Sequence, residues 1–132
     1  MIFVDSSFWI GLYTKRDSRH AQAVAVLRAH PGERLVTTNH ILGESWTFLR
    51  ARHGHKASVG LLDGLDRTPR LTLAFVGSDL EQEAWTWLRR HDEREYSFVD
   101  ATSFALMRSL RIREAFAFDG DFAAAGFVEL RP

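Results

Sequence analysis

The sequence contains no cysteine. This absence excludes disulfide bonds, thiol nucleophiles, iron–sulfur clusters and thiolate-bound zinc, so any metal ion must be held by oxygen atoms or imidazole nitrogens. Long apolar runs are also missing, since no stretch approaches the roughly 18 consecutive apolar residues of a membrane-spanning helix. The apolar segment from Met1 to Tyr13 has no basic leading part and contains Asp5, unlike a signal peptide. We therefore expect a cytoplasmic protein that binds no membrane.

An excess of charge of one sign is missing too, because 17 basic residues balance 17 acidic ones. The chain thus has no overall positive field that would indicate a nucleic-acid partner, and only the placement of its charges is informative. Repeats and linker-like runs are absent, and there are only three prolines. A length of 132 residues suits one folded unit. We expect a single domain over residues 1–132.

Short apolar strands alternate with amphipathic helices along the chain. We expect strands at 2–4, 35–37, 71–76, 115–118 and 127–130, and helices at about 6–14, 19–29, 39–53, 56–65, 78–90 and 99–110. Ser6 or Ser7 is the expected N-cap of the first helix, and Asn39 that of the third. Such alternation predicts an α/β fold in which right-handed crossovers join parallel strands and helices cover both faces of the sheet.

Four acidic residues from separate segments are expected at one edge of this sheet. Asp5 and Asp119 end strands, Asp100 lies in the first turn of a helix, and Glu44 lies near another helix start. Each of them alone is explained better as a turn residue or a helix cap. Together they fall where α/β sheets bind their ligands, at the carboxyl ends of the strands. Two carboxylates about 5 Å apart repel by roughly 3 kcal/mol at an effective dielectric near 20, so such a cluster needs a cation or shared protons.

Oxygen ligands without cysteine favour a hard cation, Mg²⁺ or Mn²⁺, over zinc. Such an ion lowers the pKa of a bound water molecule and neutralises charge that develops on a phosphate. The acid cluster therefore predicts metal-dependent hydrolysis of a phosphodiester, with a carboxylate orienting or deprotonating the attacking water.

Four segments, taken in order, resemble the PIN-domain ribonucleases: Val4-Asp5-Ser6-Ser7, Thr38-Asn39-His40-Ile41-Leu42-Gly43-Glu44, Ser97-Phe98-Val99-Asp100-Ala101-Thr102-Ser103 and Phe118-Asp119-Gly120-Asp121-Phe122. The similarity is greatest to the VapC-type toxins of bacterial and archaeal toxin–antitoxin pairs, and it covers nearly the whole chain. It implies one PIN domain over residues 1–132, built as a three-layer sandwich with a mostly parallel central sheet of four to five strands. It also implies an endoribonuclease that acts as the toxin of such a pair.

The resemblance further implies roles for individual residues and partners. The residues in metal-binding and catalytic positions are Asp5, Glu44, Asp100 and Asp119, with Asp121 as an auxiliary ligand or an outer-shell acid. Ser7 and Thr102 are expected to orient ligands and water. The implied cofactor is Mg²⁺, with Mn²⁺ as the other possibility. The implied partners are an RNA substrate, a second copy of the chain in a homodimer, and a cognate antitoxin whose C-terminal segment lies over the active-site groove.

Two weaker signals surround the third helix. Arg50, Arg52 and Lys56 could hold RNA phosphates, but cations at the solvated end of a helix explain them equally well. His40 and Glu44 are four residues apart, a spacing that can ligate a metal ion. Because no third nitrogen ligand supports it, we expect His40 to make a local hydrogen bond instead.

Two other protein classes fit the sequence less well than a ribonuclease. A phosphoacceptor signalling domain needs a late lysine beside its acid pocket, and no lysine follows Lys56. A phosphatase with an Asp-x-Asp nucleophile pair needs a second aspartate where this chain has Ser7. The remaining alternative is a catalytically inactive PIN-like module that binds RNA or protein. The presence of an acid at all four positions argues against it.

Overall fold

All five strands run parallel in one sheet in the computed structural model, which describes every residue from 1 to 132. The strands are β1 (Ile2–Val4), β2 (Leu35–Thr38), β3 (Leu71–Ala74), β4 (Glu114–Phe116) and β5 (Val128–Glu129), in the spatial order β3-β2-β1-β4-β5. The central strand pairs Phe3 with Val36 on one side and with Ala115 on the other. The predicted α/β fold with a parallel sheet of four to five strands is confirmed.

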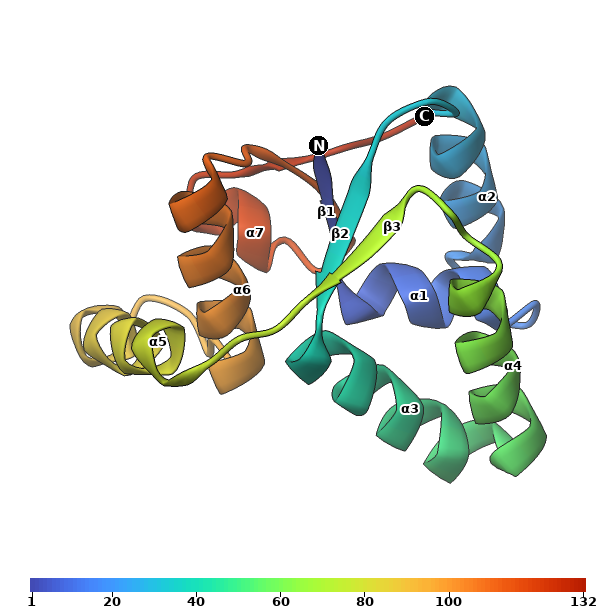
Figure 1. Ribbon diagram of the computed structural model, residues 1–132, viewed down its shortest axis with the longest axis horizontal. Coiled ribbons are helices and arrows are strands. Elements are labelled where there is room, and N and C mark those ends of the chain that lie inside the picture. The colour runs from blue at the N-terminus through green and yellow to red at the C-terminus, as the bar shows by residue number, and fades with distance from the viewer.

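Seven helices surround the sheet: α1 (Ser6–Tyr13), α2 (His20–Ala29), α3 (Asn39–His53), α4 (His55–Asp66), α5 (Ser78–Arg90), α6 (Phe98–Leu110) and α7 (Asp121–Ala124). Figure 1 shows α1, α2 and α4 on one side of the sheet and α5, α6 and α7 on the other, with α3 below the carboxyl ends of the strands. Helices thus cover both faces, as predicted. None of the seven helices is long and apolar enough to cross a lipid bilayer.

Aromatic side chains fill the core on both faces of the sheet. On the α1 side, the rings of Phe8 and Phe116 stack with their centroids 4.7 Å apart. On the α6 side, Phe104 meets Phe122 edge-on at 5.0 Å. All four side chains are completely buried, and each burial contributes roughly 1.5–3 kcal/mol. This packing supplies a rigid base for the loops at the carboxyl edge.

The first helix begins differently from the prediction. Its N-cap is Asp5, not Ser6 or Ser7, and the Asp5 carboxylate accepts a hydrogen bond from the backbone N–H of Ser7 at 3.2 Å. Aspartate serves well at this position because its oxygen satisfies an N–H group that has no partner within the helix. The residue predicted to end the first strand therefore also starts α1.

The junction between β2 and α3 also departs from the prediction. Thr38, not Asn39, is the N-cap, and its hydroxyl accepts from the Ile41 N–H at 3.0 Å. The Asn39 side chain instead accepts from the N–H of Val76 at 2.8 Å. β3 ends at Ala74, which pairs with Thr38, the last residue of β2, so the predicted strand 71–76 was too long. The short helix α7 was not predicted.

Candidate active site

The predicted acids lie at the carboxyl edge of the sheet. Asp5 directly follows β1, Asp119 lies beyond the end of β4, Glu44 is in the second turn of α3, and Asp100 is in the first turn of α6. A hollow of about 420 Å³ opens at this edge. Its lining residues are Ser6, Ser7, Ile10, Asp17, Ser18, Arg19, Glu44, Phe48 and Asp119. Glu44 and Asp119, which are distant in the sequence, thus share one cavity wall.

Asp5 lies at the buried end of this group, with 2% of its surface exposed. The Ser7 hydroxyl donates a hydrogen bond to the Asp5 carboxylate at 2.7 Å and accepts one from the N–H of Phe118 at 3.1 Å. Burial raises the pKa of Asp5 to about 7 against the lowering effect of the Ser7 hydrogen bonds, and the charges of Asp119 and Asp100 raise it further. Ser7 therefore fixes Asp5 in place and ties it to the loop that carries Asp119.

Asp100 is held by a reciprocal pair of hydrogen bonds at the start of α6. Its carboxylate accepts from the Ser97 N–H at 3.0 Å, and its own N–H donates to the Ser97 hydroxyl at 2.9 Å. Burial raises the pKa of Asp100 to about 6 despite these bonds, and the charges of Asp121 and Glu44 add to the effect. The predicted acids thus act on one another: Asp119 and Asp100 raise the pKa of Asp5, and Asp121 and Glu44 raise that of Asp100.

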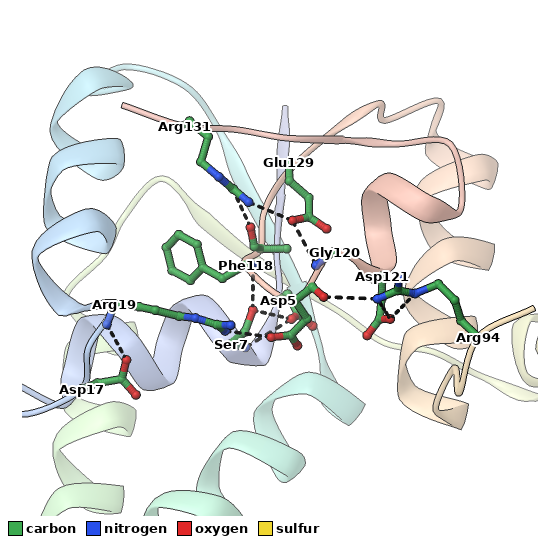
Figure 2. A network of polar contacts seen from close by, with 12 residues as sticks. Asp5, Ser7, Asp17, Arg19, Arg94, Phe118, Gly120, Asp121, Glu129 and Arg131 are labelled. Atoms are coloured by element: carbon green, nitrogen blue, oxygen red, sulfur yellow. Dashed lines mark hydrogen bonds and ion pairs between the residues drawn. The ribbon is translucent and has the colours of Figure 1, made fainter.

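Two arginines flank the acids from opposite sides. Arg19, just before α2, forms an ion pair with Asp119 at 2.8 Å. Arg94, in the loop before α6, forms one with Asp121 at 3.0 Å and also donates to the backbone carbonyl of Asp119 at 3.4 Å. Figure 2 shows both guanidinium groups pointing toward the acid group that contains Asp5. Sequence reasoning missed both residues, because no local pattern distinguishes them and Arg19 meets an acid 100 positions away.

The turn between Asp119 and Asp121 is built around Gly120, whose φ of 83° lies in the left-handed region that favours glycine. The carboxylate of Glu129 accepts hydrogen bonds from the N–H groups of Gly120 at 3.3 Å and Ala123 at 3.1 Å. Glu129 is itself held by Arg131 at 3.0 Å (Figure 2). Glu129 is thus a buried acid that supports the loop, a role that sequence reasoning also missed.

The other predicted residues lie around this centre. The hydroxyl of Thr102 is buried and donates to the Val99 carbonyl at 2.8 Å, within its own helix. Arg50, Arg52 and Lys56 are exposed on α3 and at the start of α4, outside the lining of the hollow. His40 was expected to make a local hydrogen bond, but its partner is Glu81, 3.0 Å away on the separate helix α5.

The oxygen donors suit a divalent ion chemically. Asp5, Glu44, Asp100, Asp119 and Asp121 form an all-carboxylate set, and such hard oxygen atoms are the ligands that Mg²⁺ and Mn²⁺ prefer. As the side chains are placed, no three His, Asp or Glu residues are gathered closely enough to hold one ion. Asp119 and Asp121 face the guanidinium groups of Arg19 and Arg94 instead. The two arginines therefore already balance part of the negative charge of the cluster.

Comparison with known proteins defines the class. The PIN domain family matches residues 2–128, so the chain belongs to the PIN-domain family. Within it, the chain is 53% identical over 132 residues, or 100% of its length and 99% of the relative, to the "23S rRNA-specific endonuclease VapC20" found in two strains of Mycobacterium tuberculosis. The crystal structure of that VapC20, described as a "Sarcin-Ricin loop cleaving toxin", superimposes with a TM-score of 0.93, and all of both chains is covered.

A more distant relative is the "VapC ribonuclease" of Archaeoglobus fulgidus, which is 28% identical over 114 residues, covering 83% of this chain and 72% of that protein. The resemblance to VapC-type PIN-domain ribonucleases that the four sequence segments indicated is thereby confirmed.

Proposed function

We propose that this chain, an endoribonuclease toxin of the VapC type, cleaves 23S rRNA within the sarcin–ricin loop. The observation that carries the proposal is the position of Asp5, Asp100 and Asp119 at one sheet edge, where Glu44 and Asp119 line one hollow. The particular substrate is suggested by the 53% identity to VapC20 along the entire chain. An inactive PIN-like module has less support, because every acid position is filled and a hollow gives access to Glu44 and Asp119.

The test uses purified bacterial 70S ribosomes and protein-free 23S rRNA as two separate substrates. We expect a single new 5′ end in the sarcin–ricin loop when the protein and Mg²⁺ are present, and none when EDTA replaces the ion. Mapping all new 5′ ends by primer extension shows whether the cut is unique. Cleavage only elsewhere in the RNA would refute the sarcin–ricin loop as the substrate but would support ribonuclease activity. No cleavage of any RNA would refute both the substrate and the activity.

Asp5, Glu44, Asp100 and Asp119 would hold Mg²⁺, or Mn²⁺ in its place, with Asp121 as an additional ligand. When bound, the ion activates water and stabilises charge on the phosphate. The chain's own part is to hold the acids in position. Ser7 keeps Asp5 oriented through its 2.7 Å hydrogen bond. Thr102 would act indirectly, by bracing the helical turn that carries Asp100 through its bond to Val99.

Arg19 should compete with the metal ion for Asp119. We expect Arg19→Gln to bind Mg²⁺ about two- to fivefold more tightly, since a half-exposed ion pair is worth roughly 0.2–1 kcal/mol. Isothermal titration of the EDTA-stripped protein measures this directly and does not depend on cleavage. Arg28→Gln is the control, because it removes the same charge from an exposed position nine residues further along the chain. Equal affinity of the two variants would show that Arg19 does not oppose the ion.

The proposed partners follow from the same assignment. A cognate antitoxin would restrain the nuclease by covering the acids with its C-terminal segment. A homodimer would bury apolar side chains such as Phe75 and Trp85, which are 79% and 49% exposed in the isolated chain.

Arg50, Arg52 and Lys56 would bind phosphates of the RNA outside the acid group. Because ribosomes are the proposed target, the site of action would be the cytoplasm, and residues 1–132 would work as one PIN domain.

A further inference from the structure

A stripe of three unlike side chains runs along the exposed side of α3. Glu44, Phe48 and Arg52 occupy successive turns of the helix, so the helical rise separates neighbours by about 6 Å along the axis. The Arg52 guanidinium lies over the Phe48 ring, 5.1 Å from its centroid. The stripe therefore leads from a carboxylate of the active site to an exposed aromatic ring and then to a cation.

Phe48 stands between two hollows. The first is the active-site hollow of about 420 Å³, and the second has about 580 Å³ and is lined by Asn39, His40, Gly43, Glu44, Thr47, Phe48 and Val99. Glu44 and Phe48 belong to the walls of both, so they form the ridge between them. The Phe48 side chain is not needed to close the core, since the residue is 37% exposed while Ile41, Ser45 and Leu49 fill the buried side of α3.

We propose that Phe48 is the stacking platform for an unpaired RNA base next to the cleaved bond, and that Arg52 binds the phosphate beyond it. The inference rests on the ribonuclease function proposed above and adds a subsite to it. Aromatic rings bind single-stranded nucleic acid by stacking on base faces, and arginine adds charge attraction and cation–π contact. The cation of Arg52 over the ring favours an anionic polymer over an apolar peptide.

The experiment measures cleavage of intact and abasic RNA by the parent protein and by Phe48 variants. A short synthetic RNA that contains the site mapped with the parent protein is made intact and with an abasic residue on either side of the cut. On intact RNA, Phe48→Ala should lower kcat/KM about tenfold or more, the loss expected for one base stack. On RNA that is abasic at the stacked position, the parent should lose as much, and Phe48→Ala should lose little further. Phe48→Trp should restore most of the activity, and Phe48→Leu should not.

Leu110→Ala is the control, because it removes another exposed apolar side chain, 49% exposed, that lines neither hollow. It should cleave both RNAs like the parent. The proposal would be overturned if the losses in kcat/KM caused by Phe48→Ala and by each abasic position were independent and simply multiplied. Full activity of Phe48→Ala would overturn it too. Normal cleavage combined with weaker inhibition by the antitoxin would also overturn it and would assign Phe48 to a protein contact. If the parent protein cuts no RNA, the proposed ribonuclease function is refuted. If the parent cuts RNA and the Phe48 variants do not behave as expected, only the stacking role is refuted.

Discussion

Asp5→Asn should reduce RNA cleavage to background while the protein remains folded. Asparagine caps helices as well as aspartate does, and its side-chain oxygen can still accept the hydrogen bonds that Ser7 makes to Asp5. What the substitution removes is the negative charge at the buried end of the acid group, where a divalent ion would need it. The measurement is cleavage of ribosomal RNA at saturating Mg²⁺, together with circular dichroism of the same preparation.

Asp63→Asn is the matched control for this loss. It makes the same chemical change at an exposed position on α4, outside the active-site hollow, and should leave cleavage unchanged. An Asp5→Asn variant that is folded and cuts as fast as the parent would show that the acids are assigned wrongly. A variant with lost activity but normal Mg²⁺ affinity would instead place Asp5 outside the metal site.

The sheet could be predicted because its strands are short apolar runs separated by helices. Asp5 directly follows β1, whereas β4 ends at Phe116, so the predicted strand 115–118 was too long at its carboxyl end and Asp119 lies beyond it. Parallel strands bring such ends to one edge. This reasoning predicts which acids meet without any knowledge of side-chain contacts. The carboxyl end of β3 was predicted less well, because it is set by the end of its partner strand β2 at Thr38.

The charged environment of the acids could not be predicted in the same way. Arg19 and Arg94 lie in polar loops whose sequences resemble any solvated turn, and only folding brings them to Asp119 and Asp121. The role of Glu129 could not be predicted for a similar reason. Its carboxylate accepts a hydrogen bond from the N–H of Gly120, and the sequence does not show that the two residues meet. The contacts of such residues depend on the tertiary fold. The periodicity of apolar residues, in contrast, predicts only local secondary structure.

Without a divalent ion, the protein should be more stable near pH 5 than near pH 8. Burial raises the pKa of Asp5 from 3.8 to about 7, so between these values the folded state binds a proton that the unfolded chain has released. Stability therefore falls as pH rises through this window and levels off above it. Asp100, with its pKa raised to about 6, adds in the same direction over the lower part of the window. A shift of this size in Asp5 corresponds to at most about 4 kcal/mol.

Urea denaturation in EDTA at about pH 5 and pH 8 measures this difference. The histidines titrate in the same range, so the parent is compared with Asp5→Asn, in which the other groups are unchanged and most of the pH dependence should disappear. Mg²⁺ should restore stability to the parent near pH 8, because an ion that binds only the folded state stabilises it by mass action. Stability that rises with pH in EDTA, or an equal slope in the two proteins, would show that Asp5 is already ionised in the folded state. The acids would then not need a metal ion to relieve their repulsion, and the physical basis for placing one there would be lost.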